Sequence, residues 1–299
     1  MRVILTGATG FIGTHLVPQL EAAGHTTHLL GRSPKPGLSA GSGFSIWDPA
    51  KGPPPADAFQ DADAVIHLAG EPVAQRWSPD VKRRIRSSRV DATAQLIAAI
   101  AASPRKPAVF LSASAVGYYG DRGDEVLTES SAPANGFLPS VCVEWEKAAS
   151  EATQLGIRVA LLRTGIVLGK GGGALAQMLT PFKVGLGGRL GSGKQWMPWI
   201  HMTDMCALYL AALDNPALSG PVNAVSPNPV RNDDFTAALG RALARPALLP
   251  VPEFAIRLLY GEMSQILFAS QRVVPRAAQA SGFEFRQPEI FGALKDLLA

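Results

Sequence analysis

The chain has 299 residues, a length that buries a sizeable core without disulfides or metals. Hydrophobic residues make up 47% and charged residues 17%, which excludes a disordered or fibrous chain. The net charge is only +4, and its one dense basic cluster (Lys82, Arg83, Arg84, Arg86, Arg89) is more typical of a solvated helix face than of a nucleic-acid site. We therefore predict no nucleic-acid partner.

Cysteine content and apolar runs bear on the compartment. Cys142 and Cys206 are too few for a disulfide scaffold and are not spaced as metal ligands, so we predict no metal site. Met1 and Arg2 lead directly into a strand-like segment without the apolar region of a signal peptide. The longest apolar run, residues 96–102, is shorter than the roughly 20 residues that span a bilayer. We expect a cytoplasmic protein without a membrane partner.

Short β-branched segments alternate with helical patterns over the first two thirds of the chain. This alternation predicts an α/β fold, a Rossmann doubly wound parallel sheet with a smaller, mostly helical C-terminal substrate region. The expected strands cover residues 2–6, 26–30, 64–69, 108–112 and 158–163. One helix is expected at 11–23 and another from the Ser78 cap and Pro79 to residue 102. Residues 33–55 are rich in Pro, Gly and Ser and predict a loop with one short strand at 44–47.

The last third of the chain carries more turn-forming residues. Residues 169–199 predict loops around one helix, an arrangement that often forms the mouth of a substrate site. Helices are expected at 204–214 and 233–244, a strand at 222–225, and a helical tail from 252. We divide the chain into a Rossmann domain at 1–220, with substrate loops at 169–200, and a small C-terminal region at 221–299.

A glycine-rich segment, Thr6-Gly7-Ala8-Thr9-Gly10-Phe11-Ile12-Gly13, lies between the first expected strand and the first expected helix. In such a loop the first glycine permits the tight turn, the second lets the backbone approach a diphosphate, and the third lets the helix pack closely on the strand. The diphosphate is expected at the helix N-terminus, where free N–H groups favour negative charge. This placement predicts a dinucleotide site and disfavours a merely tight turn.

The end of the second strand indicates which dinucleotide is bound. A site that prefers NAD usually has a carboxylate here for the ribose 2′-OH, whereas this chain has Gly31-Arg32-Ser33. Arg32 can pair with a 2′-phosphate, and Ser33 can add a hydrogen bond, so NADP(H) is favoured. The alternative is an exposed arginine without a role.

After the next strand, which covers residues 64–69, small residues let a flat adenine or ribose lie against the backbone. His67 in that strand is interpreted as a hydrogen-bonded core residue.

Several motifs in order carry a family resemblance. The glycine loop, His67-Leu68-Ala69-Gly70, Phe110-Leu111-Ser112-Ala113-Ser114 and Trp199-Ile200-His201-Met202-Thr203-Asp204 resemble the extended short-chain dehydrogenase/reductases, the epimerase/dehydratase group. Leu68-Ala69-Gly70-Glu71-Pro72, Gly117-Tyr118-Tyr119-Gly120, Trp145-Glu146 and Leu162-Arg163-Thr164-Gly165 are similar to its atypical "epimerase family protein" subgroup, which has its own C-terminal region. The resemblance covers essentially the whole chain.

The resemblance implies a set of cofactor contacts. They are Gly7, Thr9, Gly10, Phe11, Ile12 and Gly13 at the diphosphate, Arg32 at the 2′-phosphate, Leu68, Ala69 and Glu71 beside the adenosine, Arg89, and Thr164, Gly165, Ile166 and Val167 near the nicotinamide. From the residue types alone we add Ser33 at the 2′-phosphate and Gly70 beside the adenosine as cofactor contacts. By analogy with family members that pair through two helices, it also implies a homodimer.

The usual catalytic pair of the family is absent. Most members use a Tyr as acid or base and a Lys four residues later, and these positions read Cys142 and Glu146 here. Lys147 is one residue further on, and about 100° around a helix from the expected face. The family also uses the hydroxyl of a Ser or Thr at the end of the fifth strand, and Ser114 supplies it. We predict Ser114 and Tyr118 as catalytic residues, the alternative for Tyr118 being a packing or lid role, and interpret Cys142 as a small buried residue.

Four residues are predicted to contact substrate: Tyr119, Trp196, Trp199 and His201. For His201 the alternative is a structural hydrogen bond, and Arg163 either holds an anionic substrate or braces the loop. The leading functional hypothesis is an NADP(H)-dependent oxidoreductase acting on a small carbonyl or alcohol. The alternatives are a non-catalytic NADP(H) sensor or regulator and, suggested by the family name alone, a sugar-nucleotide epimerase.

Overall fold

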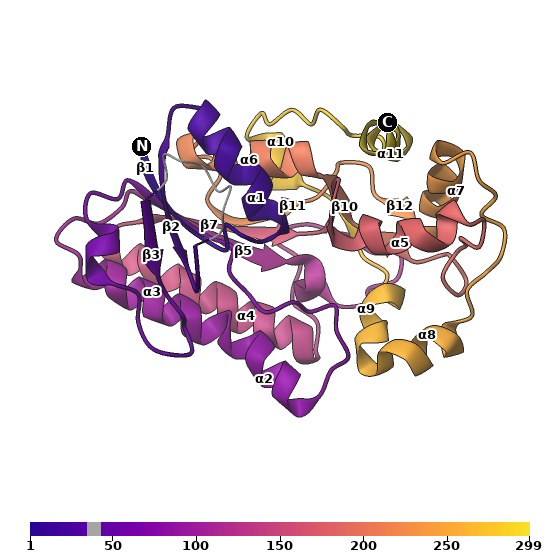
Figure 1. The fold of residues 1–299 in the computed structure, drawn as a ribbon, viewed down its shortest axis with the longest axis horizontal. Helices are drawn as coiled ribbons and strands as arrows, with labels where there is room; N and C mark the ends of the chain where they lie inside the picture. The colour runs from indigo at the N-terminus through magenta and orange to yellow at the C-terminus, as the bar shows by residue number, and fades with distance from the viewer. Residues whose placement is uncertain (35–42) are drawn as a thin grey trace.

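A parallel sheet of seven strands forms the centre of the computed structural model, which describes residues 1–34 and 43–299 (Figure 1). The strand order is β11-β7-β5-β4-β1-β2-β3, so β1 lies between β2 and β4 and the order reverses beside it. Such a reversal, at the carboxyl ends of the strands, is where open α/β sheets bind their ligands. The predicted fold class is confirmed. The strands are β1 (Arg2–Thr6), β2 (Thr26–Gly31), β3 (Gly43–Ile46), β4 (Ala64–His67), β5 (Val109–Ala115), β7 (Arg158–Thr164) and β11 (Gly220–Ala224).

Two layers of helices cover the sheet. Helices α1 (Phe11–Ala22) and α6 (Met202–Asp214) lie on one face, and α3 (Val90–Ala102) and α4 (Phe137–Ser150) on the other (Figure 1). Because side chains alternate along a strand, Leu5 of β1 packs into the core cluster of the first face and Ile4 into that of the second. The sheet is therefore buried on both sides, as a parallel sheet requires.

The helix predicted from Ser78 to residue 102 is wrong in one respect, because it is divided in two. Helix α2 (Pro79–Ser87) begins as expected, with the Ser78 hydroxyl accepting from the Val81 N–H at 3.2 Å. Helix α3 then starts after Arg89, whose guanidinium donates to the carbonyl oxygens of Glu71 at 3.0 Å and Ile85 at 3.1 Å. The division turns this one arginine of the basic cluster inward.

Three helices of the second half of the chain pack together in a cluster of their own. Helices α5 (Gly173–Lys183), α7 (Asn232–Ala242) and α11 (Ile290–Leu298) share a hydrophobic cluster. The predicted helical tail also contains a strand, β13 (Arg272–Val273), which pairs with β6 (Val126–Leu127). Strand β11 extends the large sheet four residues past the predicted boundary at 220. The other elements are β6 (Val126–Leu127), β8 (Ile166–Leu168), β9 (Trp196–Met197), β10 (Trp199–His201), β12 (Val230–Arg231), β13 (Arg272–Val273), α8 (Glu253–Tyr260), α9 (Gln265–Phe268), α10 (Arg276–Ala280), η1 (Ala56–Phe59), η2 (Val116–Tyr119), η3 (Glu151–Leu155) and η4 (Gly261–Ser264).

Helix α6 is tied to the C-terminal region by its first turn. The buried Asp204 carboxylate accepts from the backbone N–H groups of Arg286 at 2.8 Å and Gln287 at 3.0 Å. His201 caps the helix, with Nδ1 accepting from the Thr203 N–H at 3.1 Å. The cap is local, whereas the two Asp204 hydrogen bonds join residues 82 and 83 positions apart in the sequence.

The short strand predicted at 44–47 is present as β3, whereas residues 35–42 of the predicted loop lie outside the described residues. Across the described ranges, no helix has both the length and the apolar character needed to cross a bilayer.

Candidate functional site

The glycine loop follows β1 directly, at the reversal in strand order. Gly7 has φ +74°, and a Cβ added to it would lie 2.8 Å from the Ala69 nitrogen. A Cβ added to Gly13 would lie 2.3 Å from the Gly7 carbonyl oxygen and 2.6 Å from the Ala8 Cα. Both positions therefore require glycine, the first for the turn and the third for close packing of helix α1.

The N-terminus of α1 is open to a ligand. Gly10 is its N-cap residue, no side chain caps it, and no acidic residue occupies its first turn. Thr9 and Gly10 are exposed, and a Cβ on Gly10 would meet only the Gly7 carbonyl oxygen, at 3.2 Å. First-turn N–H groups have no partner within a helix, so a diphosphate fits here by charge and shape.

Replacing Gly13 by alanine tests this packing. The added methyl group would overlap backbone atoms and push α1 away from the loop, so we expect the free energy of unfolding to fall by about 1–3 kcal/mol. The measurement is urea denaturation. Gly292→Ala in the exposed face of α11 is the control, because its nearest contact is 3.9 Å away and alanine favours a helix by about 0.5–1 kcal/mol. Equal stability changes in the two variants would contradict the role assigned to Gly13.

The strands on either side of β1 bring the predicted adenosine contacts together. Arg32 and Ser33 are exposed immediately after β2. On the other side, residues 68–71 follow β4 and are exposed or half-buried. Residues 164–167, from the end of β7 into β8, are also half-buried. Gly165 approaches the Pro198 carbonyl so closely that a Cβ would lie 2.6 Å from that oxygen. The sheet thus brings the predicted cofactor residues to the carboxyl ends of its strands.

Arg89 borders this region from the helix side. Its guanidinium packs against Gly70, where a Cβ would lie 3.1 Å from Cζ, and it faces the Trp145 ring at 5.2 Å. Burial lowers the pKa of Arg89 from its ordinary value. Arg89 therefore holds a positive charge beside residues 70 and 71, and its contact with the cofactor stays a prediction.

His67 ends β4 and lies behind the glycine loop. It is fully buried, and Nδ1 shares a hydrogen bond of 2.7 Å with the Thr6 hydroxyl, as interpreted from the sequence. Burial, together with the charge of Arg89, lowers the pKa of His67 from 6.5 to about 4. The imidazole is thus neutral in the folded protein at neutral pH.

The lowered pKa predicts a loss of stability in mild acid. As the pH falls below about 6.5, the unfolded chain takes up a proton at His67, whereas the folded chain does so only near its folded pKa of about 4. Between pH 7 and pH 5 this group alone should lower the free energy of unfolding by about 2 kcal/mol. Urea denaturation of the unmodified protein and of His67→Asn at both pH values measures it; parallel pH dependences would contradict the assignment.

The central cluster of the site is built around Glu146, at the position of the usual lysine. The hydroxyl of Ser114, at the end of β5, donates to Glu146 Oε1 at 2.6 Å. Arg163 of β7 donates to the same carboxylate through Nε and Nη2, to Oε1 and Oε2, each at 2.8 Å. All three side chains are buried. The result is a bidentate ion pair that also holds the serine hydroxyl.

Arg163 joins the two tyrosines to this cluster. Burial acts to lower its pKa, but the hydrogen bonds and charge of Glu146 outweigh burial and raise it. Nη1 donates to the Tyr119 hydroxyl at 2.9 Å, which itself donates to Asn223 Oδ1 at 2.7 Å. The guanidinium also lies 3.6 Å from the centre of the Tyr118 ring. Of the two predicted roles for Arg163, the structure favours bracing.

This network corrects the prediction for Tyr119 and leaves that for Tyr118 open. Tyr119 has no exposed surface, and burial raises its pKa to about 12. Its hydroxyl is engaged on both sides, so it offers no group to a substrate. Tyr118, four residues after Ser114, is half-buried, and its catalytic role stays a prediction.

The two other residues considered at the missing pair behave as expected from the sequence. Cys142 is buried, and burial, followed by the charge of Glu146, raises its pKa to about 12, so it is a protonated, unreactive thiol. Lys147 is exposed and does not share the face of α4 that carries Glu146.

The predicted substrate residues Trp196, Trp199 and His201 do not line a common surface. Trp199 is fully buried in the cluster of α5, α7 and α11, with Nε1 donating to the Asn228 carbonyl at 3.1 Å, which leaves no surface for a substrate. His201 is buried as the cap of α6, with Nε2 3.3 Å from Asp296 Oδ2, which agrees with its structural alternative. Trp196 alone is partly exposed, and the guanidiniums of Arg231 and Arg272 each lie 4.7 Å from its ring centre.

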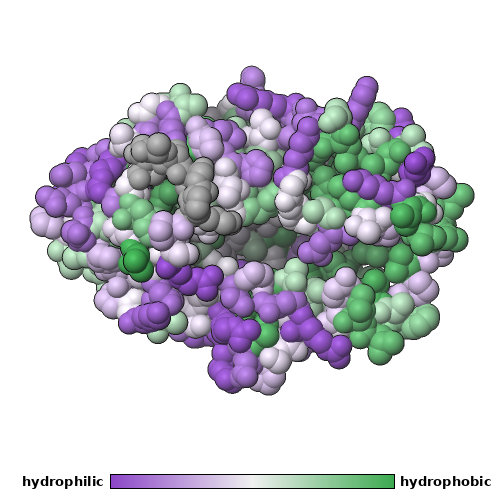
Figure 2. All heavy atoms as spheres, in the orientation of Figure 1, coloured by the Kyte–Doolittle hydropathy of each residue, from purple (hydrophilic) through white to green (hydrophobic). Residues whose placement is uncertain are grey.

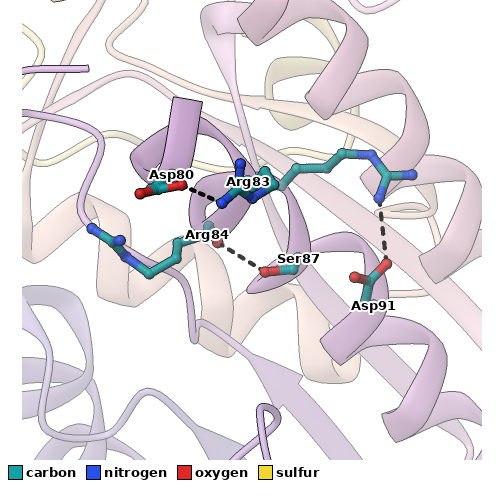
Figure 3. A pocket seen from close by; sticks show the side chains of 6 residues that line it. Asp80, Arg83, Arg84, Ser87 and Asp91 are labelled. Atoms are coloured by element: carbon teal, nitrogen blue, oxygen red, sulfur yellow. Dashed lines mark hydrogen bonds and ion pairs between the residues drawn. The ribbon is translucent and has the colours of Figure 1, made fainter. Parts of the chain in front are cut away.

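The basic cluster on α2 is largely neutralised by carboxylates. Arg83 pairs with Asp80 (Figure 3). Arg86 lies 3.5 Å from Asp91. These pairs are those of a solvated helix face, and the absence of a nucleic-acid partner stays a prediction. A surface pocket of about 570 Å³ lies here; its lining is Asp80, Arg83, Arg84, Arg86, Ser87 and Asp91.

Sequence reasoning missed Glu146 as a functional side chain. The sequence identifies Glu146 only as the residue at the position of the usual lysine. The residues around Glu146 do not indicate that the Arg163 side chain, 17 residues later, pairs with it. A possible signal was the simultaneous presence of an acid on the α4 face and a basic residue at the end of the neighbouring strand.

Comparison with known proteins gives two family matches. A family model described as "NAD dependent epimerase/dehydratase family" matches residues 3–225. A second, "Domain of unknown function (DUF1731)", matches residues 251–297. The first covers the sheet and the site, and the second covers α8 through most of α11.

Individual relatives resemble the chain along its whole length. A protein of Arabidopsis thaliana named "Epimerase family protein SDR39U1 homolog, chloroplastic" is 41% identical over 100% of this chain and 87% of its own length. An epimerase family protein of Mycobacterium bovis is 43% identical over 98% of this chain and 96% of its own. The crystal structure of human epimerase family protein SDR39U1 (isoform 2) with NADPH has a TM-score of 0.88 at 35% identity, covering 100% of this chain and 99% of that one. The chain therefore belongs to the NAD dependent epimerase/dehydratase family, with a DUF1731 domain in its C-terminal region.

Proposed function

We propose that this chain is an NADP(H)-dependent oxidoreductase that acts on a small carbonyl or alcohol substrate. The observation that carries the proposal is the hydrogen bond of 2.6 Å between the Ser114 hydroxyl and Glu146, at the carboxyl end of the strand next to β4. A hydroxyl held by a carboxylate is a proton acceptor placed where the family performs its chemistry. NADP(H), when bound, donates or accepts the hydride.

The cofactor assignment is supported by the strand ends around β1. The glycine loop offers free N–H groups to a diphosphate, and Arg32 after β2 offers a positive charge without a competing carboxylate beside it. The human relative crystallised with NADPH has 35% identity and the same fold over the full chain. Both lines favour the phosphorylated dinucleotide.

Ser114 and Glu146 can replace the usual Tyr and Lys as a proton relay. Because the Ser114 proton points to Glu146, the serine oxygen presents its lone pairs to a substrate hydroxyl. A proton taken from that hydroxyl can pass through Ser114 to Glu146 while Arg163 holds the carboxylate in place. The high pKa values of Tyr119 and Cys142, both about 12, disfavour these two groups as the acid.

A turnover screen tests the proposal. The full chain is incubated with NADPH and a broad carbonyl panel, and with NADP⁺ and the matching alcohols, while absorbance of the reduced nicotinamide is followed. We expect turnover with at least one pair, and its loss in Ser114→Ala with NADPH affinity retained. Absence of turnover across the panel with normal NADPH binding would overturn the oxidoreductase.

The second candidate is a non-catalytic NADP(H) sensor. It is favoured by the buried ion pair between Glu146 and Arg163, because such a pair can serve a purely structural role. It predicts a protein partner whose affinity changes with the redox state of the cofactor.

Both cysteines are buried and unpaired, which supports our expectation that the protein is cytoplasmic.

A further inference from the structure

Exposed large apolar side chains are concentrated on one part of the molecule. Elsewhere in the described residues such side chains are scattered, as at Ile46 and Val143. Figure 2 shows hydrophobic residues gathered on the side where α5, α7 and α8 lie. We call this set the apolar surface; it comprises Val184, Leu186, Leu248, Leu249, Phe254, Leu258 and Leu259.

The two loops that carry part of the apolar surface pair beside α8. The Val251 N–H donates to the Arg189 carbonyl at 2.8 Å, and the Gly191 N–H donates to the Val251 carbonyl at 2.9 Å. Arg245 Nε also donates to the Lys183 carbonyl at 3.3 Å. The loop after α5 therefore lies against the segment that leads into α8.

Helix α8 buries none of its eight residues. Phe254 and Leu258, one turn apart on the same face, are 74% and 78% exposed, and Leu259 is 63% exposed. A helix this short owes its stability to packing of an apolar face, and a cluster of exposed large apolar residues marks an interaction site. The face of α8 is thus without its partner.

Charge around the apolar surface indicates what the partner is. The bordering segments, 181–194 and 241–259, carry six exposed basic side chains and one acidic side chain, Glu253, which pairs with Arg257. Asp233 and Asp234 at the start of α7 lie beside residue 193, so six basic side chains face three acidic ones. A second copy of the chain would bring like charges together and is disfavoured. The basic side chains are Lys183, Arg189, Lys194, Arg241, Arg245 and Arg257.

We propose that the apolar surface binds an anionic lipid bilayer peripherally. Phe254, Leu258 and the two leucines before α8 enter the headgroup boundary, while the surrounding Lys and Arg side chains contact acidic headgroups. None of the described helices is long and apolar enough to span the bilayer. This departs from the sequence-based expectation of no membrane partner, which considered only spanning and signal segments.

Vesicle flotation of the full chain tests the proposal. We expect binding to vesicles of phosphatidylcholine with phosphatidylglycerol, weakened by added salt, and little binding to phosphatidylcholine alone. Phe254→Ser with Leu258→Ser should lower the partition coefficient by about tenfold or more, and Lys183→Ala with Arg245→Ala by about fivefold for each charge. Ile46→Ser with Val143→Ser is the matched control, since it removes two exposed apolar residues outside the apolar surface.

Three outcomes would overturn the proposal. The first is no binding to anionic vesicles by a protein that still binds NADPH, and the second is equal loss in the control and in Phe254→Ser with Leu258→Ser. The third is a dimer, seen by light scattering, that this double variant dissociates, because the apolar surface would then belong to a second copy. Unchanged NADPH affinity in every variant shows that the fold is retained.

Discussion

Replacing Glu146 by alanine is expected to lower the free energy of unfolding by about 3–5 kcal/mol. The substitution leaves the Arg163 guanidinium buried, with a side chain only 2% exposed, and without the two hydrogen bonds that compensate its charge. It also removes the acceptor of the Ser114 hydroxyl. Guanidinium chloride denaturation, with the slope checked for unchanged two-state behaviour, measures the effect.

Glu144→Ala on the same helix provides the control. Glu144 pairs with Arg86, but the two side chains are 39% and 46% exposed, so the loss should stay below about 1 kcal/mol. Replacing Glu146 and Arg163 together by leucine and methionine should recover much of the stability, because no unpaired charge remains. A Glu146→Ala variant as stable as Glu144→Ala would show that Arg163 reaches solvent.

Arg32→Ala is expected to weaken NADPH binding by roughly 10–150-fold, the range of a charge-assisted hydrogen bond. Affinity for NADH should change little, because NADH has no 2′-phosphate for Arg32 to pair with. Isothermal titration of both nucleotides to both proteins gives the four constants. Arg32 is exposed after β2, so its removal should not affect folding.

Arg83→Ala controls for net charge in the nucleotide titrations. It removes one exposed positive charge on α2, at a residue that pairs with Asp80 and is not a predicted cofactor contact. NADPH affinity should be unchanged in this variant. If the unmodified protein bound NADPH and NADH equally well, the 2′-phosphate argument would be wrong.

Local patterns in the sequence were sufficient to predict the sheet and the cofactor loop. Strands β1 and β4 are short runs of apolar residues buried on both sides. Gly13 is required by contacts within the turn between β1 and α1, and Gly7 by its positive φ in the same turn. His67 was likewise read correctly, because a histidine in an apolar strand needs a hydrogen-bond partner and Thr6 of the adjacent strand supplies it.

The rest of the site depends on contacts between distant segments. The inward turn of Arg89 requires the carbonyls of Glu71 and Ile85, and a helical pattern alone continues through it. Tyr119 and Trp199 were assigned to substrate because aromatic residues often line pockets, yet both fill the core. Their burial is decided by Asn223 and Asn228, more than a hundred residues after Tyr119 and 29 after Trp199.

The anchoring of Asp204 has a consequence for how the protein is made. Its two backbone donors follow it by 82 and 83 residues, which at about 5–20 residues per second corresponds to roughly 4–16 s of translation. Until then the nascent chain holds a carboxylate at the start of α6 that cannot be buried without cost. The sheet and the C-terminal region are therefore expected to become stable together, as one cooperative unit, rather than in the order of their synthesis.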